Sequence, residues 1–260
     1  MENLFPPYFY NYYEPFVGSG AVFFYVKSKL KLRTVVLSDI NEELMNCFVV
    51  VRDRPFELIE LLLSHRDNHS REYYYAVRSM GINRLDSIES AARLIYLNKT
   101  CFNGLYRVNS KGQFNVPLGD YQNPRIFDKN VLLQASQLLQ DVEPRIMTFE
   151  KVLDFAGKDD LVYLDSPYIP LSRTSSFTQY SRSDFSLKEQ KRLSDVFRIL
   201  DSRGCFVMLS NSDHPLMRQL YGDYMKNTVR VSARRMINSM GSKRSAISEI
   251  VLRNYSTGAV

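Results

Sequence analysis

The apolar run Leu161–Leu164 is followed directly by four residues that could bind a ligand or take part in a reaction, namely Asp165, Ser166, Pro167 and Tyr168. A strand that delivers a carboxylate and an aromatic ring to the edge of a sheet is costly unless a ligand binds there, because burial strips the carboxylate of water. Such a pair suits a flat nitrogenous base: the ring stacks on the base, and the carboxylate accepts a hydrogen from its exocyclic amine. Taken alone, the four residues are more typical of a turn that begins at an aspartate.

A second group lies near the start of the chain, where Glu14 to Gly20 reads EPFVGSG. Gly18 and Gly20 stand where a strand is expected to turn into a helix, so the backbone can approach a ligand closely. Asp39 ends the next predicted strand about twenty residues further on, the spacing at which a carboxylate binds ribose hydroxyls. Because the full dinucleotide motif with its third glycine is missing, the pattern indicates an adenosine ligand without a pyrophosphate.

The elements that must position these groups alternate between strand and helix at both ends of the chain. A helix is expected from about Ala21, a strand over Thr34–Asp39 and a helix over 41–51. The alternation resumes with RIMTF, DLVYLD and a helix that starts with a capping box of Ser186 and Glu189. We therefore predict an α/β fold with a Rossmann-like, mostly parallel sheet and ligands at the carboxyl ends of its strands.

Helical segments replace this alternation from Pro55 to about Glu143. They predict a helical insertion, which divides the chain into a domain of residues 1–54 and 144–260 and an inserted domain of residues 55–143. His65 and His69 have the spacing of two metal ligands on one helix face, but they lack a third partner, so we expect no metal.

The composition is that of a globular protein of 260 residues with 45% hydrophobic content. Its 34 Lys and Arg against 28 Asp and Glu modestly favour a polyanionic partner. Cys47, Cys101 and Cys205 are odd in number and widely spaced, so they suggest neither a disulfide framework nor a clustered zinc site and fit a reducing cytoplasm. No apolar run is long enough to span a bilayer and no signal peptide precedes residue 10, so we expect a cytoplasmic protein without a membrane partner.

In order, the segments EPFVGSG, SDIN, TCFNGLYRVNSKGQFNVPLGDY, DLVYLDSPY and FVMLSNS resemble the Dam-type, D12-class DNA adenine-N6 methyltransferases that modify GATC. The resemblance runs from about Tyr12 to Asn254. It implies a class I methyltransferase fold, S-adenosylmethionine as the methyl donor and double-stranded DNA as the partner. The helical insertion would then be the target-recognition domain.

The resemblance also implies roles for single residues around the reacting groups. Asp165 and the main-chain carbonyl of Ser166 would accept both N6 hydrogens of a flipped-out adenine, while Tyr168 stacks on the base beside Pro167. Transfer would be direct and in line, so the protein orients the reactants and supplies electrostatics. The residues expected around the donor are Glu14, Phe16, Gly18, Gly20, Asp39, Ile40, Phe149 and Asp165, with Gly18 and Gly20 at the methionine, Asp39 at the ribose and Phe149 near the donor adenine.

For the DNA, the resemblance places Phe102 and Asn103 at the opened base pair and Arg107 at a guanine, a contact worth about 1–3 kcal/mol of discrimination. Further DNA contacts are expected at Asn109, Pro117 and Tyr121. The stretch from Lys226 to Arg244 holds six basic residues, among them Arg234 and Arg235, and no acid. It is equally typical of a solvated loop and of an arm that contacts phosphates.

Departures from the family pattern keep a second hypothesis open, namely a catalytically impaired relative that binds DNA without methylating it. Nothing before Tyr12 matches the family's Lys-Trp-x-Gly-Gly-Lys segment, as if the chain starts late. Ser166 replaces a proline and so loses its fixed φ, and Asp120 and Thr148 differ from residues common in relatives. Methylation of an amine in RNA or on a glutamine is a third possibility. A cognate restriction endonuclease, a solitary or phage role and the oligomeric state stay open.

Overall fold

The computed structural model describes residues 2–169, 185–233 and 247–257. By its internal contacts the chain forms two compact units, Met1–Ile40 with Met147–Val260, and Asn41–Ile146. The second unit thus begins before the predicted insertion and includes helix α2 (Glu42–Asp53). The predicted division into residues 1–54 with 144–260 and residues 55–143 stays a prediction.

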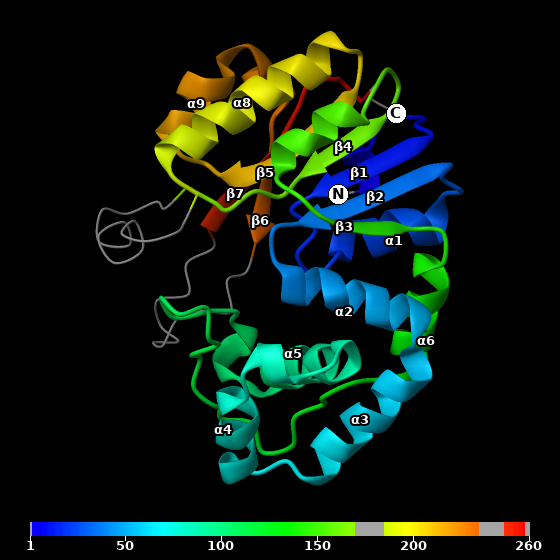
Figure 1. The fold of residues 1–260 in the computed structure, drawn as a ribbon. Helices are drawn as coiled ribbons and strands as arrows, with labels where there is room; N and C mark the ends of the chain where they lie inside the picture. Colours follow the sequence, from blue (N-terminus) through cyan, green and yellow to red (C-terminus); the bar gives the residue numbers. More distant parts are fainter. Residues whose placement is uncertain (1, 170–184, 234–246, 258–260) are drawn as a thin grey trace. The chain divides into compact units, whose positions relative to one another are not determined.

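A seven-stranded sheet in the order β3-β2-β1-β4-β5-β7-β6 is the main feature of the fold (Figure 1). Strands β1, β2, β4 and β5 pair in parallel, whereas β7 is antiparallel to both β5 and β6. This arrangement confirms the predicted α/β fold with a Rossmann-like, mostly parallel sheet. The strands are β1 Asn11–Pro15, β2 Thr34–Asp39, β3 Glu143–Ile146, β4 Leu161–Leu164, β5 Phe206–Ser212, β6 Val229–Ala233 and β7 Ile247–Arg253.

The helices of the first unit include α8 (Leu187–Ser202), whose start is set by its sequence. The Ser186 hydroxyl accepts a hydrogen bond from the Lys188 amide, and the Glu189 carboxylate accepts one from the Ser186 amide, so the predicted capping box is present. Gly204, with φ of +79°, follows its end. The other helical elements of this unit are α1 Ala21–Lys29, α9 Pro215–Tyr221 and the 3-10 helices η1 Glu2–Leu4, η4 Phe149–Asp154 and η5 Gly222–Asn227.

The core of the first unit lies between α8 and one face of the sheet. The buried stripe of α8 packs in one cluster with alternate residues of the strands, among them Tyr13, Val162 and Leu209. Because side chains alternate along a strand, the residues between them point to the opposite face. The stripe consists of Leu193, Val196, Phe197 and Leu200, as the sequence predicted.

The second unit is helical, as its sequence pattern predicted. Arg93 on α5 is 3% exposed and donates to the Glu43 carboxylate at 2.8 Å and to the carbonyls of Val77 and Arg78, so one buried cation ties three helices together. Besides α2 and α5 (Ser87–Thr100), the unit contains α3 Pro55–Asp67, α4 Arg71–Ser79, α6 Lys129–Leu139 and the 3-10 helices η2 Ile82–Arg84 and η3 Phe102–Gly104.

The two histidines of this unit belong to its packing. His65 Nδ1 lies 2.8 Å from the Tyr73 hydroxyl, and His69 Nδ1 lies 2.8 Å from the Tyr96 hydroxyl. Burial lowers the pKa of both imidazoles. Among the residues that the structure describes, no group of three or more His, Cys, Asp or Glu side chains could hold a metal ion. In the same part of the chain, no helix has the length and apolar content that crossing a membrane requires.

Candidate functional site

Three parallel strands of the first unit end at one edge of the sheet. In the register of β1 and β2, Pro15 lies beside Ser38, and in that of β1 and β4, Tyr13 lies beside Val162. The Gly18–Gly20 turn, Asp39 and Asp165 therefore follow or end adjacent strands at the same edge. This is the place at which α/β sheets bind ligands.

The Gly-Ser-Gly turn owes its shape to backbone angles that favour glycine. Gly18 and Gly20 have φ of +49° and +70°. The Gly20 amide donates to the Val17 carbonyl at 2.7 Å, and the Val17 amide donates to the Ser38 carbonyl at 3.1 Å. The turn is thus fastened to the end of β2, and α1 starts directly after it at Ala21.

Glu14, at the end of β1, is a buried acid that is only 2% exposed. It accepts a hydrogen bond of 2.8 Å from the Tyr12 hydroxyl and another from the Phe23 backbone amide. Burial, together with the negative charge of Asp165, nevertheless raises the pKa of Glu14 to about 8. Glu14 is therefore largely protonated at neutral pH.

Asp165 keeps an exposed surface at the end of β4, yet protein atoms crowd its carboxyl group. The resulting loss of hydration, and next the negative charge of Glu249, raise the pKa of Asp165 to about 6, although a hydrogen bond from the Tyr168 hydroxyl opposes the shift. At neutral pH this carboxylate is mostly ionised and can accept a hydrogen bond from an amine.

The segment after Asp165 is fastened to β5 and α8. The buried Ser166 hydroxyl accepts from the Asn211 amide group at 3.4 Å, and Asn211 Oδ1 accepts from the Ile169 amide at 3.0 Å. Gln190 donates to the Pro167 carbonyl at 3.1 Å. Side chains of β5 and α8 thereby hold residues 166–169 in place. The sequence predicted no role for Asn211 or Gln190, because contacts between distant segments of one chain leave no local pattern.

Two of the expected donor residues are aromatic: Phe16 is half-buried, and Phe149 is 7% exposed. The Phe16 and Phe149 rings stack with centroids 5.3 Å apart, and Phe185 lies 5.5 Å from each. Ile40 is 72% exposed, and Asp39 is half-buried. The buried Ser38 hydroxyl has no hydrogen-bond partner within the described ranges. The structure thus brings Glu14, Phe16, Gly18, Gly20, Asp39, Phe149 and Asp165 together in one unit.

A hairpin of the second unit carries Arg107 and Asn109. Val108 and Phe114 form an antiparallel bridge, and Arg107 donates to the Asn115 side chain at 2.7 Å and to its carbonyl at 3.3 Å. The exposed Arg107 guanidinium is therefore held on the hairpin. Asn109 Oδ1 accepts from the amides of Lys111 and Gln113, so this side chain shapes the turn.

The other expected DNA residues of this unit meet where α5 ends. Phe102 is 41% exposed and its amide donates to the Pro117 carbonyl at 2.9 Å, while Asn103 adopts a left-handed φ of +55°. Tyr121 is 45% exposed and its ring lies against Gly119. Phe102, Asn103, Pro117 and Tyr121 thus share one surface. Arg234 and Arg235 lie outside the described residues.

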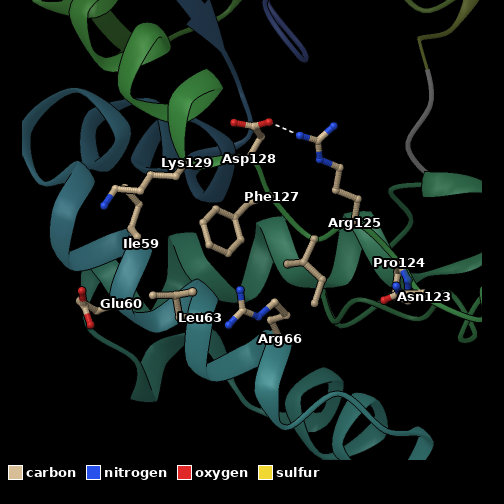
Figure 2. A pocket seen from close by; sticks show the side chains of 11 residues that line it. Ile59, Glu60, Leu63, Arg66, Asn123, Pro124, Arg125, Phe127, Asp128 and Lys129 are labelled. Atoms are coloured by element: carbon tan, nitrogen blue, oxygen red, sulfur yellow. Dashed lines mark hydrogen bonds and ion pairs between the residues drawn. The ribbon is translucent and has the colours of Figure 1, made fainter.

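A hollow of about 710 Å³ lies in the second unit between α3 and residues 123–129. Figure 2 shows the side chains that line it. Ile59, Leu63 and Phe127 provide its apolar part. Among its charged groups, Arg125 forms an ion pair with Asp128, and Arg66 forms one with Asp67. None of its lining residues was singled out from the sequence as a site residue, and no motif marks the hollow.

Comparison with known proteins agrees with this geometry. Residues 1–237 match the family model of the D12 class N6 adenine-specific DNA methyltransferases. The chain is 44% identical to the type II methyltransferase M1.LlaDCHI of Lactococcus lactis subsp. cremoris, over 98% of this chain and 90% of the relative. It is 45% identical to the type II methyltransferase M.MjaIII of Methanocaldococcus jannaschii (94% and 88% covered) and 32% identical to the DNA adenine methylase of Escherichia coli K12 (95% and 87% covered). The chain therefore belongs to the D12 class of N6 adenine-specific DNA methyltransferases, whose methyl donor is S-adenosylmethionine.

Proposed function

We propose that this chain is an active methyltransferase that modifies N6 of adenine in GATC sites of double-stranded DNA. One observation carries the proposal of activity: an ionisable, partly exposed Asp165 lies at the same sheet edge as the Gly18–Gly20 turn and Asp39. The GATC site is inferred from the resemblance of the segment around Arg107 to enzymes that modify this sequence. The exposed, anchored guanidinium of Arg107 supports that reading.

The residues at this edge suit S-adenosylmethionine, which supplies an electrophilic methyl group on a sulfonium. Gly18 and Gly20 leave the backbone of their turn open to the methionine portion, and Asp39 offers a carboxylate to the ribose hydroxyls. Phe16, Ile40 and Phe149 offer apolar surface to the donor adenine. The Ser38 hydroxyl, which has no partner within the described ranges, and the largely protonated Glu14 carboxyl group suit the polar parts of the donor. The mostly ionised Asp165 suits its cationic sulfonium.

For the transfer itself, Asp165 and the Ser166 carbonyl accept the two hydrogens of the adenine amine. This orients the nitrogen lone pair and stabilises the positive charge that develops on nitrogen as the methyl group arrives. The Tyr168 hydroxyl donates to Asp165, so the ring expected to stack on the adenine is linked to the acceptor of its amine. Pro167 fixes the backbone between them.

The impaired relative remains the competing hypothesis, because Ser166 lacks the fixed φ of proline. The argument from Ser166 is weakened by the hydrogen bonds that hold residues 166–169. Asn211, which is fully buried, holds both Ser166 and Ile169, and Gln190 holds Pro167. These bonds anchor the segment to β5 and α8, whereas a proline would fix the φ of residue 166 itself.

The test of activity is transfer of labelled methyl groups to duplexes that contain GATC or an altered site. We expect label in the GATC duplex alone and none with Asp165→Asn. Binding of DNA without any transfer by the wild-type chain would favour the impaired hypothesis. Equal labelling of both duplexes would refute the assignment of GATC as the recognition site. Label in RNA or protein but not in DNA would refute the assignment of DNA as the substrate.

The role of Arg107 is tested by the change Arg107→Ala, with Lys111→Ala on the same exposed hairpin as the control. Loss of a bidentate guanine contact should lower discrimination by about 1–3 kcal/mol, which is about 5- to 150-fold. The control should weaken binding to GATC and altered duplexes alike. Unchanged preference in Arg107→Ala would contradict this role. Phe102, Asn103, Asn109, Pro117, Tyr121, Arg234 and Arg235 remain proposed DNA contacts, each to be tested by the same pair of duplexes.

The two relatives described as type II methyltransferases lead us to propose that this chain also works beside a restriction endonuclease in the cytoplasm. DNA methylated by the purified chain should then resist cleavage by the endonuclease encoded next to it. Cleavage at the normal rate would exclude that partner.

A further inference from the structure

We propose that Glu249 on β7 is a further positioning residue of the methylation site, whose negative charge makes Asp165 a stronger acceptor for the adenine amine. Glu249 acts here through Asp165, so its role rests on the proposed function of that carboxylate. Neither the motifs of the sequence nor the expected donor and DNA residues include Glu249.

The strand register places Glu249 on the face of the sheet opposite α8. In the antiparallel pair of β5 and β7, Asn211 lies opposite Ile250 and Ser212 lies opposite Glu249. Ile250 belongs to the core cluster that packs on α8. Since side chains alternate along a strand and directly opposed residues share a face, Glu249 and Ser212 point to the other side.

The neighbouring strands contribute polar groups to that same face. Tyr13 and Val162 pack toward α8, so Tyr12, Glu14 and Tyr163 point to the opposite side. A contact across the strands agrees with this, because the Tyr163 and Ser210 hydroxyls are 2.8 Å apart. The Ser210 hydroxyl also hydrogen-bonds to Tyr168.

Met208 lies directly opposite Tyr163, and Val251 lies directly opposite Ser210, so the polar residues of β1, β4, β5 and β7 form a diagonal row on this face of the sheet. They are Tyr12 and Glu14 from β1, Tyr163 from β4, Ser210 and Ser212 from β5, and Glu249 from β7.

Within this row, Glu249 is the neighbouring charge that acts on both Asp165 and Tyr168. Burial is the largest cause of the raised pKa of both groups, and the negative charge of Glu249 raises each pKa further because a like charge opposes ionisation. A carboxylate with a raised pKa is the stronger hydrogen-bond acceptor, and a phenol with a raised pKa remains a donor. Glu249 thus strengthens Asp165 as the acceptor of the amine and keeps Tyr168 donating to it. Glu14, which is largely protonated, contributes less charge at neutral pH.

The direct test is the titration of Asp165 in the full chain, followed by nuclear magnetic resonance with carbon-13 in the aspartate carboxyl groups. The spectrum of Asp165→Asn assigns its signal. In Glu249→Gln we expect the midpoint of Asp165 to fall by part of the interval between about 6 and its ordinary value of 3.8, because burial, the largest cause of the raised pKa, remains. Glu249→Asp should preserve most of the wild-type midpoint. Glu72→Gln removes one exposed acid from the second unit and should leave it unchanged.

An unchanged midpoint in Glu249→Gln would overturn the proposal, and so would an equal fall in Glu72→Gln, which would indicate a net-charge effect. Circular dichroism of each variant excludes misfolding as the cause. This experiment needs neither donor nor DNA. If the wild-type chain transferred no methyl group, the proposed function would therefore fail while the influence of Glu249 on Asp165 would still be decided.

The kinetic test is the acid limb of kcat/KM for methyl transfer, which reports the ionisation of the essential carboxylate before DNA binds. We expect Glu249→Gln to move this limb to lower pH by the interval seen in the titration and to lower the plateau. Glu249→Asp should restore both. A plateau lowered equally at every pH, with an unmoved limb, would show a merely structural role and refute the proposal.

Discussion

Replacement of Glu14 by glutamine should stabilise the protein at neutral pH, by an amount that depends on pH. The Glu14 carboxyl group is 2% exposed, and burial raises its pKa from 4.5 to about 8. Glutamine has nearly the same shape, and its carbonyl oxygen can still accept the hydrogen bond from Tyr12. The substitution therefore removes the ionisation while it preserves the packing.

The magnitude follows from the proton that the folded chain retains. Between the unfolded pKa of 4.5 and the folded pKa of about 8, Glu14 is protonated in the folded state but ionised in the unfolded state. The unfolded state then binds fewer protons, so the free energy of unfolding falls by about 1.4 kcal/mol per pH unit. The loss is absent below pH 4.5, reaches about 3 kcal/mol at pH 7 and levels near 5 kcal/mol above pH 8.

The free energies of unfolding of the wild-type chain and Glu14→Gln are measured by urea denaturation at several pH values between 4.5 and about 8. The difference in the free energy of unfolding should grow with pH in favour of the glutamine variant and then become constant. Glu72→Gln, which loses an exposed acid, is the control and should show no such growth. A constant difference between Glu14→Gln and wild type over the whole window would refute the reasoning.

Three further substitutions test other parts of the structure. Gly20→Ala should lower the free energy of unfolding by about 1–2 kcal/mol and weaken S-adenosylmethionine binding in calorimetry, because the φ of Gly20 is +70°. Gly81 has a φ of −73° and open space around it, so Gly81→Ala should do neither. In Gly119→Ala the new Cβ would lie 2.8 Å from the Cys101 carbonyl oxygen, so the backbone must shift and displace Tyr121. We therefore expect weaker duplex binding in a gel-shift assay. Wild-type affinity would contradict the proposed contact of Tyr121 with DNA. Arg93→Met should cost about 3–5 kcal/mol in urea denaturation, because it leaves the Glu43 carboxylate buried without its cation, and Arg93→Met with Glu43→Gln should recover part of that loss.

The elements that follow or precede the expected site residues could be predicted because their evidence is local. The apolar run before Asp165, the glycines after Glu14 and the capping box at Ser186 are each readable within a few residues. The structure confirms the mostly parallel sheet and the capping box at the start of α8 that these patterns predicted. The strand predicted for RIMTF is β3 (Glu143–Ile146), and Phe149 instead begins η4, because that ring packs on Phe16.

What could not be predicted depends on pairing between distant segments. The support of residues 166–169 comes from Asn211 and Gln190, which lie far along the chain. The face on which Glu249 points depends on the register of β7 with β5, and a shift of one residue would reverse it. A sequence pattern of period two shows that a strand alternates, but it does not show which strand lies next to it.

The ends of the second unit leave the first at neighbouring points. Asp39 closes β2 just before the chain departs at Asn41, and its carbonyl accepts a hydrogen bond of 3.2 Å from the Met147 amide, where the chain returns. A segment whose two ends emerge side by side can be lengthened, shortened or exchanged without pulling apart the strands that flank it. Such a junction would let evolution, or a protein engineer, exchange the second unit while the strands of the first stay unaltered.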